Sequence, residues 1–132
     1  MKIRCRAVSK GTAQGKALVS KEPISFLGGI DPRTGTIVEK GHSLEGENIA
    51  GKVLIFPKGK GSTVGAYVLY QLKKRGKAPA AIINIKADTT VASGSIIAGI
   101  PMVHKPEKNP LEIKEGSIVI VNANEGYIEV ME

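Results

Sequence analysis

The sequence predicts a mixed α/β domain in which sheet packs on sheet and helices are few. Two short, continuous apolar runs, KVLIF (52–56) and AAIINI (80–85), are typical of strands buried on both faces. A helical pattern lies between them, so strand, helix and strand form a parallel, right-handed crossover unit. Strands at 117–121 and 127–131 flank the turn sequence NANEG and form a hairpin. With 132 residues, 42% of them hydrophobic, we expect one domain, residues 1–132.

The helix of this crossover unit has one apolar face and recognisable ends. Ser62 or Thr63 stands where an N-cap belongs, and Gly76 stands where a left-handed C-cap belongs. Three basic residues directly before Gly76 suit the negative end of the helix dipole. The apolar face consists of Val64, Val68, Leu69 and Leu72.

The loop in front of this helix reads PKGKGST and combines two glycines with two lysines. Gly59 and Gly61 let the backbone approach closely and turn amide groups toward whatever lies at the helix N-terminus. Lys58 and Lys60 add two mobile positive charges. The loop is therefore either a flexible turn before a capped helix or a site for an anion. It is not a Walker loop, because a glycine separates the second lysine from the serine.

The first residues of the chain have a strand pattern. In KIRCRAV (2–8), charged residues alternate with Ile3, Cys5 and Ala7, which we expect to face the core. A second short strand follows at 15–19, so the opening is predicted to form a hairpin or the edge of a barrel-like sheet.

Residues 87–99 are mostly small, and polar and apolar residues are mixed among them. We expect one helical turn there, with Val91, Ile96 and Ile97 directed inward. A short strand at 100–103 follows and ends at His104.

Residues 23–46 form a long segment that is rich in glycine, proline and turn residues. Such segments inside compact domains are more often functional than idle. Its turn DPRTG carries Arg33 at the tip, where a guanidinium either clamps a carboxylate or phosphate or is simply solvated. His42, in a polar loop, is expected at the surface and is assigned no role.

The composition excludes several classes of function. The single cysteine cannot form an internal disulfide or build an iron–sulfur site from this chain alone. With 4% aromatic residues, no Trp and scattered lysines, the net charge of +7 does not indicate a nucleic-acid surface. A phosphorylated or carboxylated small molecule, or an acidic protein partner, accounts for this charge. Without a signal-peptide pattern or a run long enough to span a bilayer, we expect a soluble, cytoplasmic protein.

Three separated pieces of the chain together resemble one family. They are GGIDPRTGTI (28–37), GKVLIFPKGKGST (51–63) and APAAII (78–83), and they look like the small, swivelling-domain subunit of the aconitase X group. The resemblance implies a β/β/α swivelling domain like the mobile domain of aconitase. It also implies docking on a separate large subunit whose cysteines hold an iron–sulfur cluster, with no cofactor bound by this chain.

The activity that this resemblance implies is a dehydration. The family reaction converts (R)-5-phosphomevalonate to trans-anhydromevalonate 5-phosphate in the archaeal modified mevalonate pathway, which supplies isoprenoids. The family's catalytic serine carries over onto Ser62, whose alkoxide needs stabilisation by amides, a helix N-terminus and cations. Expected to bind the substrate or to stabilise the serine are Gly29, Arg33, Lys58, Lys60, Gly61 and Thr63.

Three other functions stay open at this point. The aconitase X group also includes dehydratases of cis-3-hydroxyproline. The segment GIPMVH and the C-terminal strands also look like phosphohistidine swivelling domains, but the preceding TTVASGS has no histidine and His104 lies after the Gly-Ile-Pro segment. Finally, the chain is a non-catalytic binding module if Ser62 serves only as an N-cap.

Overall fold

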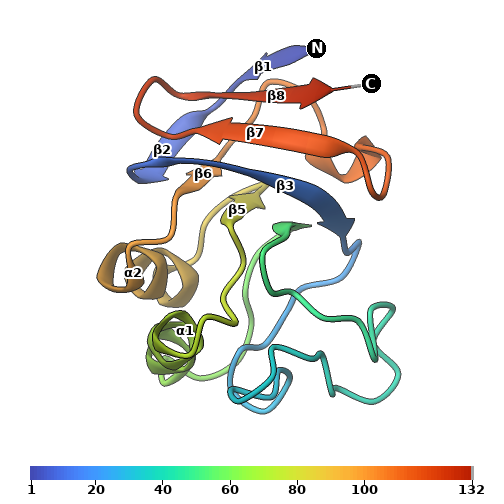
Figure 1. Cartoon of the computed structure of the whole chain (residues 1–132), viewed down its shortest axis with the longest axis vertical. Helices are drawn as coiled ribbons and strands as arrows, with labels where there is room; N and C mark the ends of the chain where they lie inside the picture. Colours follow the sequence, from blue (N-terminus) through green and yellow to red (C-terminus); the bar gives the residue numbers. More distant parts are fainter. Residues whose placement is uncertain (132) are drawn as a thin grey trace.

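The computed structural model describes residues 1–131 as one eight-stranded sheet with two α-helices and a short 3-10 helix against it (Figure 1). The elements in chain order are β1 (Lys2–Arg4), β2 (Arg6–Ser9), β3 (Thr12–Val19), β4 (Val53–Phe56), α1 (Gly65–Lys74), β5 (Ala81–Asn84), α2 (Thr89–Ala98), β6 (Met102–His104), η1 (Pro110–Glu112), β7 (Ile118–Asn122) and β8 (Tyr127–Met131). No helix in this described part is long and apolar enough to cross a bilayer.

The strand order is β1-β8-β7-β3-β4-β5-β6-β2. Its two ends, β1 and β2, are consecutive in the chain and are separated only by Cys5. The sheet therefore closes on itself like a barrel, which leaves few unpaired edge strands. The barrel-like alternative for the opening strands is confirmed, whereas the hairpin is wrong, because β2 pairs with β6 and β3 pairs with β4 and β7.

The opening strand is interrupted at Cys5, so the predicted alternation of exposed and buried side chains does not continue beyond it. Ile3 is buried and Cys5 is half-buried, as expected, but Ala7 is exposed. The pairing of β2 with β6 shifts in register between Ala7 and Ser9, and it is Ser9 that is buried. The inward position predicted for Ala7 is therefore wrong.

The predicted crossover unit is confirmed. β4 and β5 pair in parallel with α1 between them, and β5 and β6 repeat this arrangement with α2 between them. The hairpin predicted at the C-terminus is also present, because β7 and β8 pair antiparallel. Figure 1 shows α1 and α2 side by side, on one side of the sheet.

The core has two layers that meet at the central strands. In β4, Val53 and Ile55 join a cluster inside the closed sheet, while Leu54 and Phe56 join a second cluster under the helices. All four side chains are fully buried, as the continuous apolar run predicts. The result is the predicted arrangement of sheet on sheet covered by helices.

Helix α1 begins later than expected. Its N-cap is Val64, which has no side-chain capping bond, so the N-cap predicted at Ser62 or Thr63 is wrong. The side chain of Val64 is exposed, so its predicted place on the buried face of the helix is also wrong. The reason is an extra turn before the helix, in which the N–H of Gly65 bonds the carbonyl of Ser62. The C-terminus is as predicted, with Gly76 in the left-handed region at φ 70°.

Helix α2 is longer than the single turn expected for this segment. It spans ten residues, because the Asp88 side chain caps its N-terminus and Gly99, at φ 70°, ends it. Val91 faces the core, but Ile96 and Ile97 are exposed. Their inward position was wrong because the face that carries Val91 continues through Ser95 and Ala98.

The stretch 20–52, between β3 and β4, contains no named helix or strand. It lies beside α1 in Figure 1, and isolated bridges such as Ile30 with Ile37 hold it together. It also fills the helix side of the core with Ile24, Phe26, Ile30, Ile37 and Ile49. This segment is therefore ordered by its own apolar side chains.

Candidate active site

The PKGKGST loop leaves the carboxyl end of β4 and enters the N-terminus of α1. In parallel α/β units, ligands collect at this end of the strands. The loop is held from two sides, and this support fixes the path of its backbone.

Gly59 is the point at which the loop is clamped. Its N–H donates to Oδ1 of Asp88 at 2.8 Å. On the opposite side, Ile24 pairs with the loop: its N–H donates to Lys58 O at 3.2 Å, and its carbonyl accepts from Lys60 N at 3.0 Å. A Cβ at Gly59 would lie 2.5 Å from Cγ2 of Val91, so only glycine fits without displacement.

Gly61 then redirects the chain into the helix. Its φ of +95° lies in the region that favours glycine, and a Cβ there would be 2.8 Å from Oγ of Ser25. The Ser25 hydroxyl donates to the carbonyl of Leu27 at 2.8 Å, which fixes its position. Gly61 is therefore required both by its backbone conformation and by the space available.

Ser62 lies on the surface at the start of the turn that leads into α1. Its Oγ accepts a hydrogen bond from the N–H of Val64 at 3.1 Å. Within residues 1–131, the N–H groups of Gly61, Ser62 and Thr63 donate to no protein acceptor. Free amides and the positive end of the helix dipole favour negative charge here, on a bound anion or on the serine oxygen.

The two loop lysines differ in their surroundings. Lys60 Nζ forms an ion pair with Oε2 of Glu39 at 2.8 Å. Glu39 also lies beside Gly29, because a Cβ on that glycine would be 3.3 Å from Oε1. Lys58 is exposed and makes no ion pair with the described residues. The structure thus brings Gly29, Lys60 and the Ser62 loop together and leaves Lys58 as their unpaired cation.

Arg33 lies elsewhere. Its guanidinium is 3.6 Å from Oδ1 of Asp31 within the same turn, and its side chain is exposed. This turn packs near the end of α1, because a Cβ on Gly35 would be 2.9 Å from the carbonyl of Lys77. Ser62 precedes the same helix, whose ten residues span about 15 Å. No contact joins Arg33 to the loop, and its substrate-binding role stays a prediction.

Sequence reasoning missed three residues that support the loop. Asp88 had a local signal, because an aspartate directly before a helix is a common N-cap. Ser25 and Glu39 had none, since their positions depend on contacts between segments that are distant in the chain.

The two histidines have structural partners. His42 is buried, contrary to expectation: its Nδ1 accepts from Leu44 N at 3.0 Å, and its Nε2 lies 3.1 Å from the carbonyl of Pro23. His104 Nδ1 accepts from the N–H of Ala87 at 2.9 Å. Burial, and then the nearby positive charges, lower the pKa of His104 and favour its neutral form.

No metal-binding cluster of His, Cys, Asp or Glu is present among residues 1–131. Cys5 is half-buried, and burial raises its pKa to about 11, which disfavours the thiolate that binds metals. The described residues therefore do not fit an iron–sulfur cluster.

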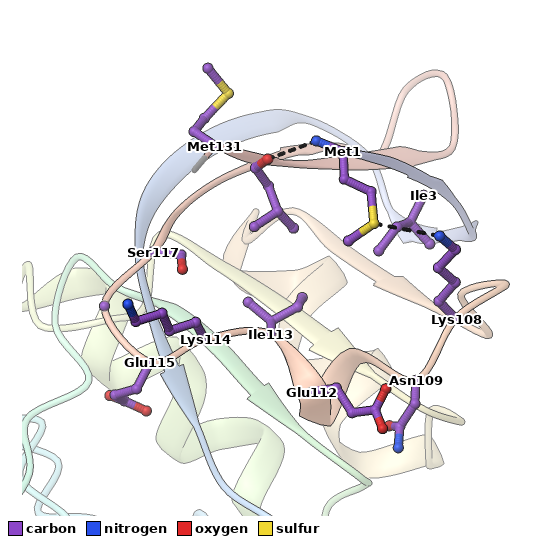
Figure 2. A pocket seen from close by; sticks show the side chains of 12 residues that line it. Met1, Ile3, Lys108, Asn109, Glu112, Ile113, Lys114, Glu115, Ser117 and Met131 are labelled. Carbon is purple, nitrogen blue, oxygen red and sulfur yellow. Dashed lines mark hydrogen bonds between the residues drawn. The ribbon is translucent and has the colours of Figure 1, made fainter.

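A cavity of about 570 Å³ lies at one mouth of the closed sheet, between the chain ends and the segment around η1 (Figure 2). Ile3, Ile113 and Val130 form its apolar wall, and the N-terminal amine donates to the carbonyl of Val130 at 2.9 Å. None of the loop residues lines it, so this cavity is separate from the candidate active site.

Comparisons with known proteins agree on one family. The model of the aconitase X swivel domain matches residues 2–130. The phosphomevalonate dehydratase small subunit of Methanocella arvoryzae is 60% identical over 131 residues, covering 98% of this chain and 99% of the relative. The small subunit of the same name from Methanosarcina mazei is 57% identical over 132 residues, covering 99% and 92%.

A solved structure gives the same result. The chain matches the crystal structure of Thermococcus kodakaraensis aconitase X in its holo form with a TM-score of 0.96 and 48% identity, covering 100% of this chain and 99% of that chain. Sequence and fold agree over nearly the whole length, so this chain belongs to the aconitase X swivel-domain family.

Proposed function

We propose that this chain is the small subunit of a hydro-lyase that dehydrates (R)-5-phosphomevalonate to trans-anhydromevalonate 5-phosphate. The observation that carries the proposal is the Ser62 hydroxyl, which is bonded by the Val64 N–H at the start of α1. This geometry occurs in a chain 60% identical to a phosphomevalonate dehydratase small subunit. A cytoplasmic reaction in the archaeal mevalonate route to isoprenoids belongs to the same proposal.

The proposed role of Ser62 is that of the base. Its alkoxide takes a proton from the carbon next to the substrate carboxylate, the electrons of that C–H bond form the double bond, and the tertiary hydroxyl leaves with the electrons of its C–O bond. A serine hydroxyl is a weak acid, so the negative charge of its alkoxide must be stabilised by nearby positive groups. The Val64 N–H, the dipole of α1 and the cation of Lys58 provide this stabilisation.

The substrate's anionic groups fit the rest of the loop. The free N–H groups of Gly61 and Thr63 suit a carboxylate or phosphate oxygen, and Lys58 and Lys60 add positive charge. Arg33 is proposed to contact the same substrate. An Arg33→Ala complex with unchanged KM and kcat would remove Arg33 from the proposal.

The other half of the reaction is assigned to a large subunit. Relatives named small subunit imply a larger partner. The described residues do not fit a cluster, so the partner's cysteines are proposed to hold it. When bound there, the cluster supplies a Lewis acid for the departing hydroxyl. The isolated chain is then inactive.

The test is co-expression of this chain with the large subunit from the same genome. After anaerobic cluster reconstitution, dehydration of 5-phosphomevalonate is measured for the wild type, Ser62→Ala and Thr63→Ala. We expect turnover to require both chains and to disappear in Ser62→Ala. Thr63→Ala is the matched control, because it removes the neighbouring hydroxyl but keeps the backbone amide.

Two results would contradict the proposal. Turnover that persists in Ser62→Ala would exclude the serine base. A stable, cluster-bearing complex that leaves phosphomevalonate unchanged would exclude this substrate, and cis-3-hydroxyproline would be assayed next.

A further inference from the structure

A second pocket, of about 380 Å³, lies where the two ends of the sheet meet. Two short segments line it. Arg4, Cys5 and Arg6 come from the junction of β1 and β2, and Lys105 and Glu107 come from the segment that follows β6. We call these five residues the seam pocket. Its volume is in the range of small-molecule sites, which begins at about 300 Å³.

The backbone around the seam pocket is held by hydrogen bonds. The N–H of Glu107 donates to the carbonyl of Arg4 at 2.9 Å, which joins the two segments directly. The N–H of Cys5 donates to the carbonyl of Gly126 at 2.9 Å, in the turn between β7 and β8. The pocket is therefore a fixed feature of the fold and exists before any ligand binds.

The seam pocket carries an excess of positive charge. Three of its five side chains are basic, and Glu107 is the single acidic one. None of the three basic groups forms an ion pair with any acidic group among residues 1–131. Arg6 lies directly opposite His104 in the pairing of β2 with β6, so it is close to Lys105, the next residue. Cations that share a concave surface without a counter-ion attract an anion.

The backbone of Lys105 is unusual. Its φ of +50° makes it the single residue other than glycine with a positive φ in the described chain. Glycine or asparagine is favoured in this region, and Pro106, which follows, restricts the conformation further. Strained residues of this kind cluster at ligand sites. A lysine here has a conformational cost that a role in binding explains.

The seam pocket is separate from the candidate active site. None of the residues of the PKGKGST loop lines it. In the strand order, β6 and β2 are two and three positions away from β4, which leads into that loop. At about 4.8 Å per strand, the separation along the sheet is roughly 10–14 Å. An anion in the seam pocket is therefore a second ligand.

We propose that the seam pocket binds a phosphate-bearing small molecule through Arg4, Arg6 and Lys105. Arginine guanidinium groups bind phosphate oxygens in pairs, and lysine adds a point charge. The pocket is too small for the extended charged surface that a nucleic acid requires. This site goes beyond the proposed dehydration and does not depend on it.

The experiment is an NMR titration of the full, ¹⁵N-labelled chain. The probes are inorganic phosphate, diphosphate and glycerol 3-phosphate, and sodium chloride keeps the ionic strength constant. We expect saturable shifts of the amide signals of Cys5, Lys105 and Glu107. The ring protons of His104 give a second signal: the bound anion offsets the positive charges beside it, so the pKa of His104 should rise. His42, in the stretch 20–52, is the internal reference.

The variants remove one charge at a time. Arg6→Gln and Lys105→Asn should weaken the affinity roughly tenfold, as for a lost charge-assisted hydrogen bond. Lys10→Gln is the matched control, because Lys10 is exposed and lines no pocket, and it should bind within about twofold of the wild type. Glu107→Gln should bind more tightly, since it removes the repulsive carboxylate.

Lys105→Asn separates binding from folding. Asparagine tolerates a positive φ better than lysine does, so this variant should unfold at the same urea concentration as the wild type or at a higher one. Affinity should fall all the same. A variant that is at least as stable as the wild type but binds the anion more weakly supports a ligand-binding role for the side chain.

The order of affinities distinguishes the sources of the phosphate group. Tighter binding of glycerol 3-phosphate than of the two inorganic probes would assign the pocket to phosphate monoesters, and the reverse order would assign it to free phosphate or diphosphate. The Lys58→Met and Ser62→Ala variants should keep the shifts at Cys5 and Lys105, because neither residue lines the pocket.

Four results would overturn the proposal. They are the absence of saturable shifts at the pocket with all three probes, shifts confined to the amides of residues 58–63, an equal loss of affinity in Lys10→Gln, and weaker binding of the large subunit by Arg6→Gln in a chain that binds none of the probes. The last result would assign the cations to an acidic group of the partner. Because the titration needs neither the large subunit nor turnover, its failure would leave the proposed function intact, and the converse also holds.

Discussion

The carboxylate of Asp88 accepts a hydrogen bond from the backbone N–H of Gly59 at 2.8 Å. Its other oxygen accepts from the N–H of Val91 at 3.4 Å, within the first turn of α2. One side chain thus joins the loop that carries Ser62 to the N-terminus of a different helix. The position of the candidate base therefore depends on a residue that is separated from the loop in the chain by α1 and β5.

Replacement of Asp88 should therefore affect both stability and catalysis. Asp88→Ala removes the N-cap of α2 and the acceptor of Gly59, and we expect a loss of about 1–2 kcal/mol in the free energy of unfolding. Turnover of the complex should fall, because the loop is no longer fixed. Urea unfolding and kcat measurements check both effects.

Asp88→Asn is the matched control, because an amide oxygen still accepts from Gly59. Its NH2 group cannot accept from the N–H of Val91, so we expect it to recover most of kcat but only part of the stability. If Asp88→Ala lost stability but kept full kcat, Asp88 would be a helix cap with no role in positioning the loop.

The two loop lysines are expected to contribute unequally to substrate binding. Lys60 is already paired with Glu39, whereas Lys58 has no ion pair in the described chain. Lys58→Met should therefore raise the KM for the phosphorylated substrate by roughly tenfold, and Lys60→Met should raise it less. Steady-state kinetics of the complex check this order, and a larger effect at Lys60 would reverse it.

The sequence predicted the β4-α1-β5 unit because its signals are local. Continuous apolar runs mark the strands, a regular apolar face marks the helix, and Gly76 marks its end. The same signals failed for α2, where the segment is composed mostly of small residues and two isoleucines face outward. Local sequence patterns do not show which apolar side chains the folded chain leaves exposed to solvent.

The candidate site also combines features that the sequence predicts with features that only the fold reveals. Ser62 and the glycines beside it are contiguous, so the loop was predictable from the sequence and the resemblance. The Glu39–Lys60 ion pair and the packing of Ser25 against Gly61 join residues from distant segments, and no spacing rule predicts them. Arg33 was assigned to the substrate from its charge and position; its turn packs near Lys77, and its role stays a prediction.

Cys5 should react slowly with alkylating reagents in the folded chain. Burial raises its pKa from 9.0 to about 11, so the thiolate fraction near neutral pH falls roughly 100-fold. Since Cys5 is the only cysteine, the rate of iodoacetamide labelling reports on it alone. The control is the same chain unfolded in urea, and equal rates in both states would show that the thiol is not protected.

The last prediction concerns pH and His104. Its Nδ1 accepts from the N–H of Ala87 only when the ring is neutral. Burial and then the positive charges of Lys105, Arg6 and Lys86 lower the pKa of His104 below its ordinary 6.5. The unfolded chain therefore binds more protons, and stability should decline as the pH falls below 6.5.

The variant His104→Asn separates this effect from other titrations. Its Oδ1 keeps an acceptor for Ala87 but does not ionise, so the decline between about pH 7 and pH 5 should shrink. Glu22, whose pKa is lowered mainly by the backbone N–H of Ser43, changes stability only below its ordinary 4.5 and leaves this window clear. Urea unfolding at several pH values gives the slopes. An identical slope in wild type and His104→Asn would assign the decline to other groups, because only the histidine titration distinguishes the two chains.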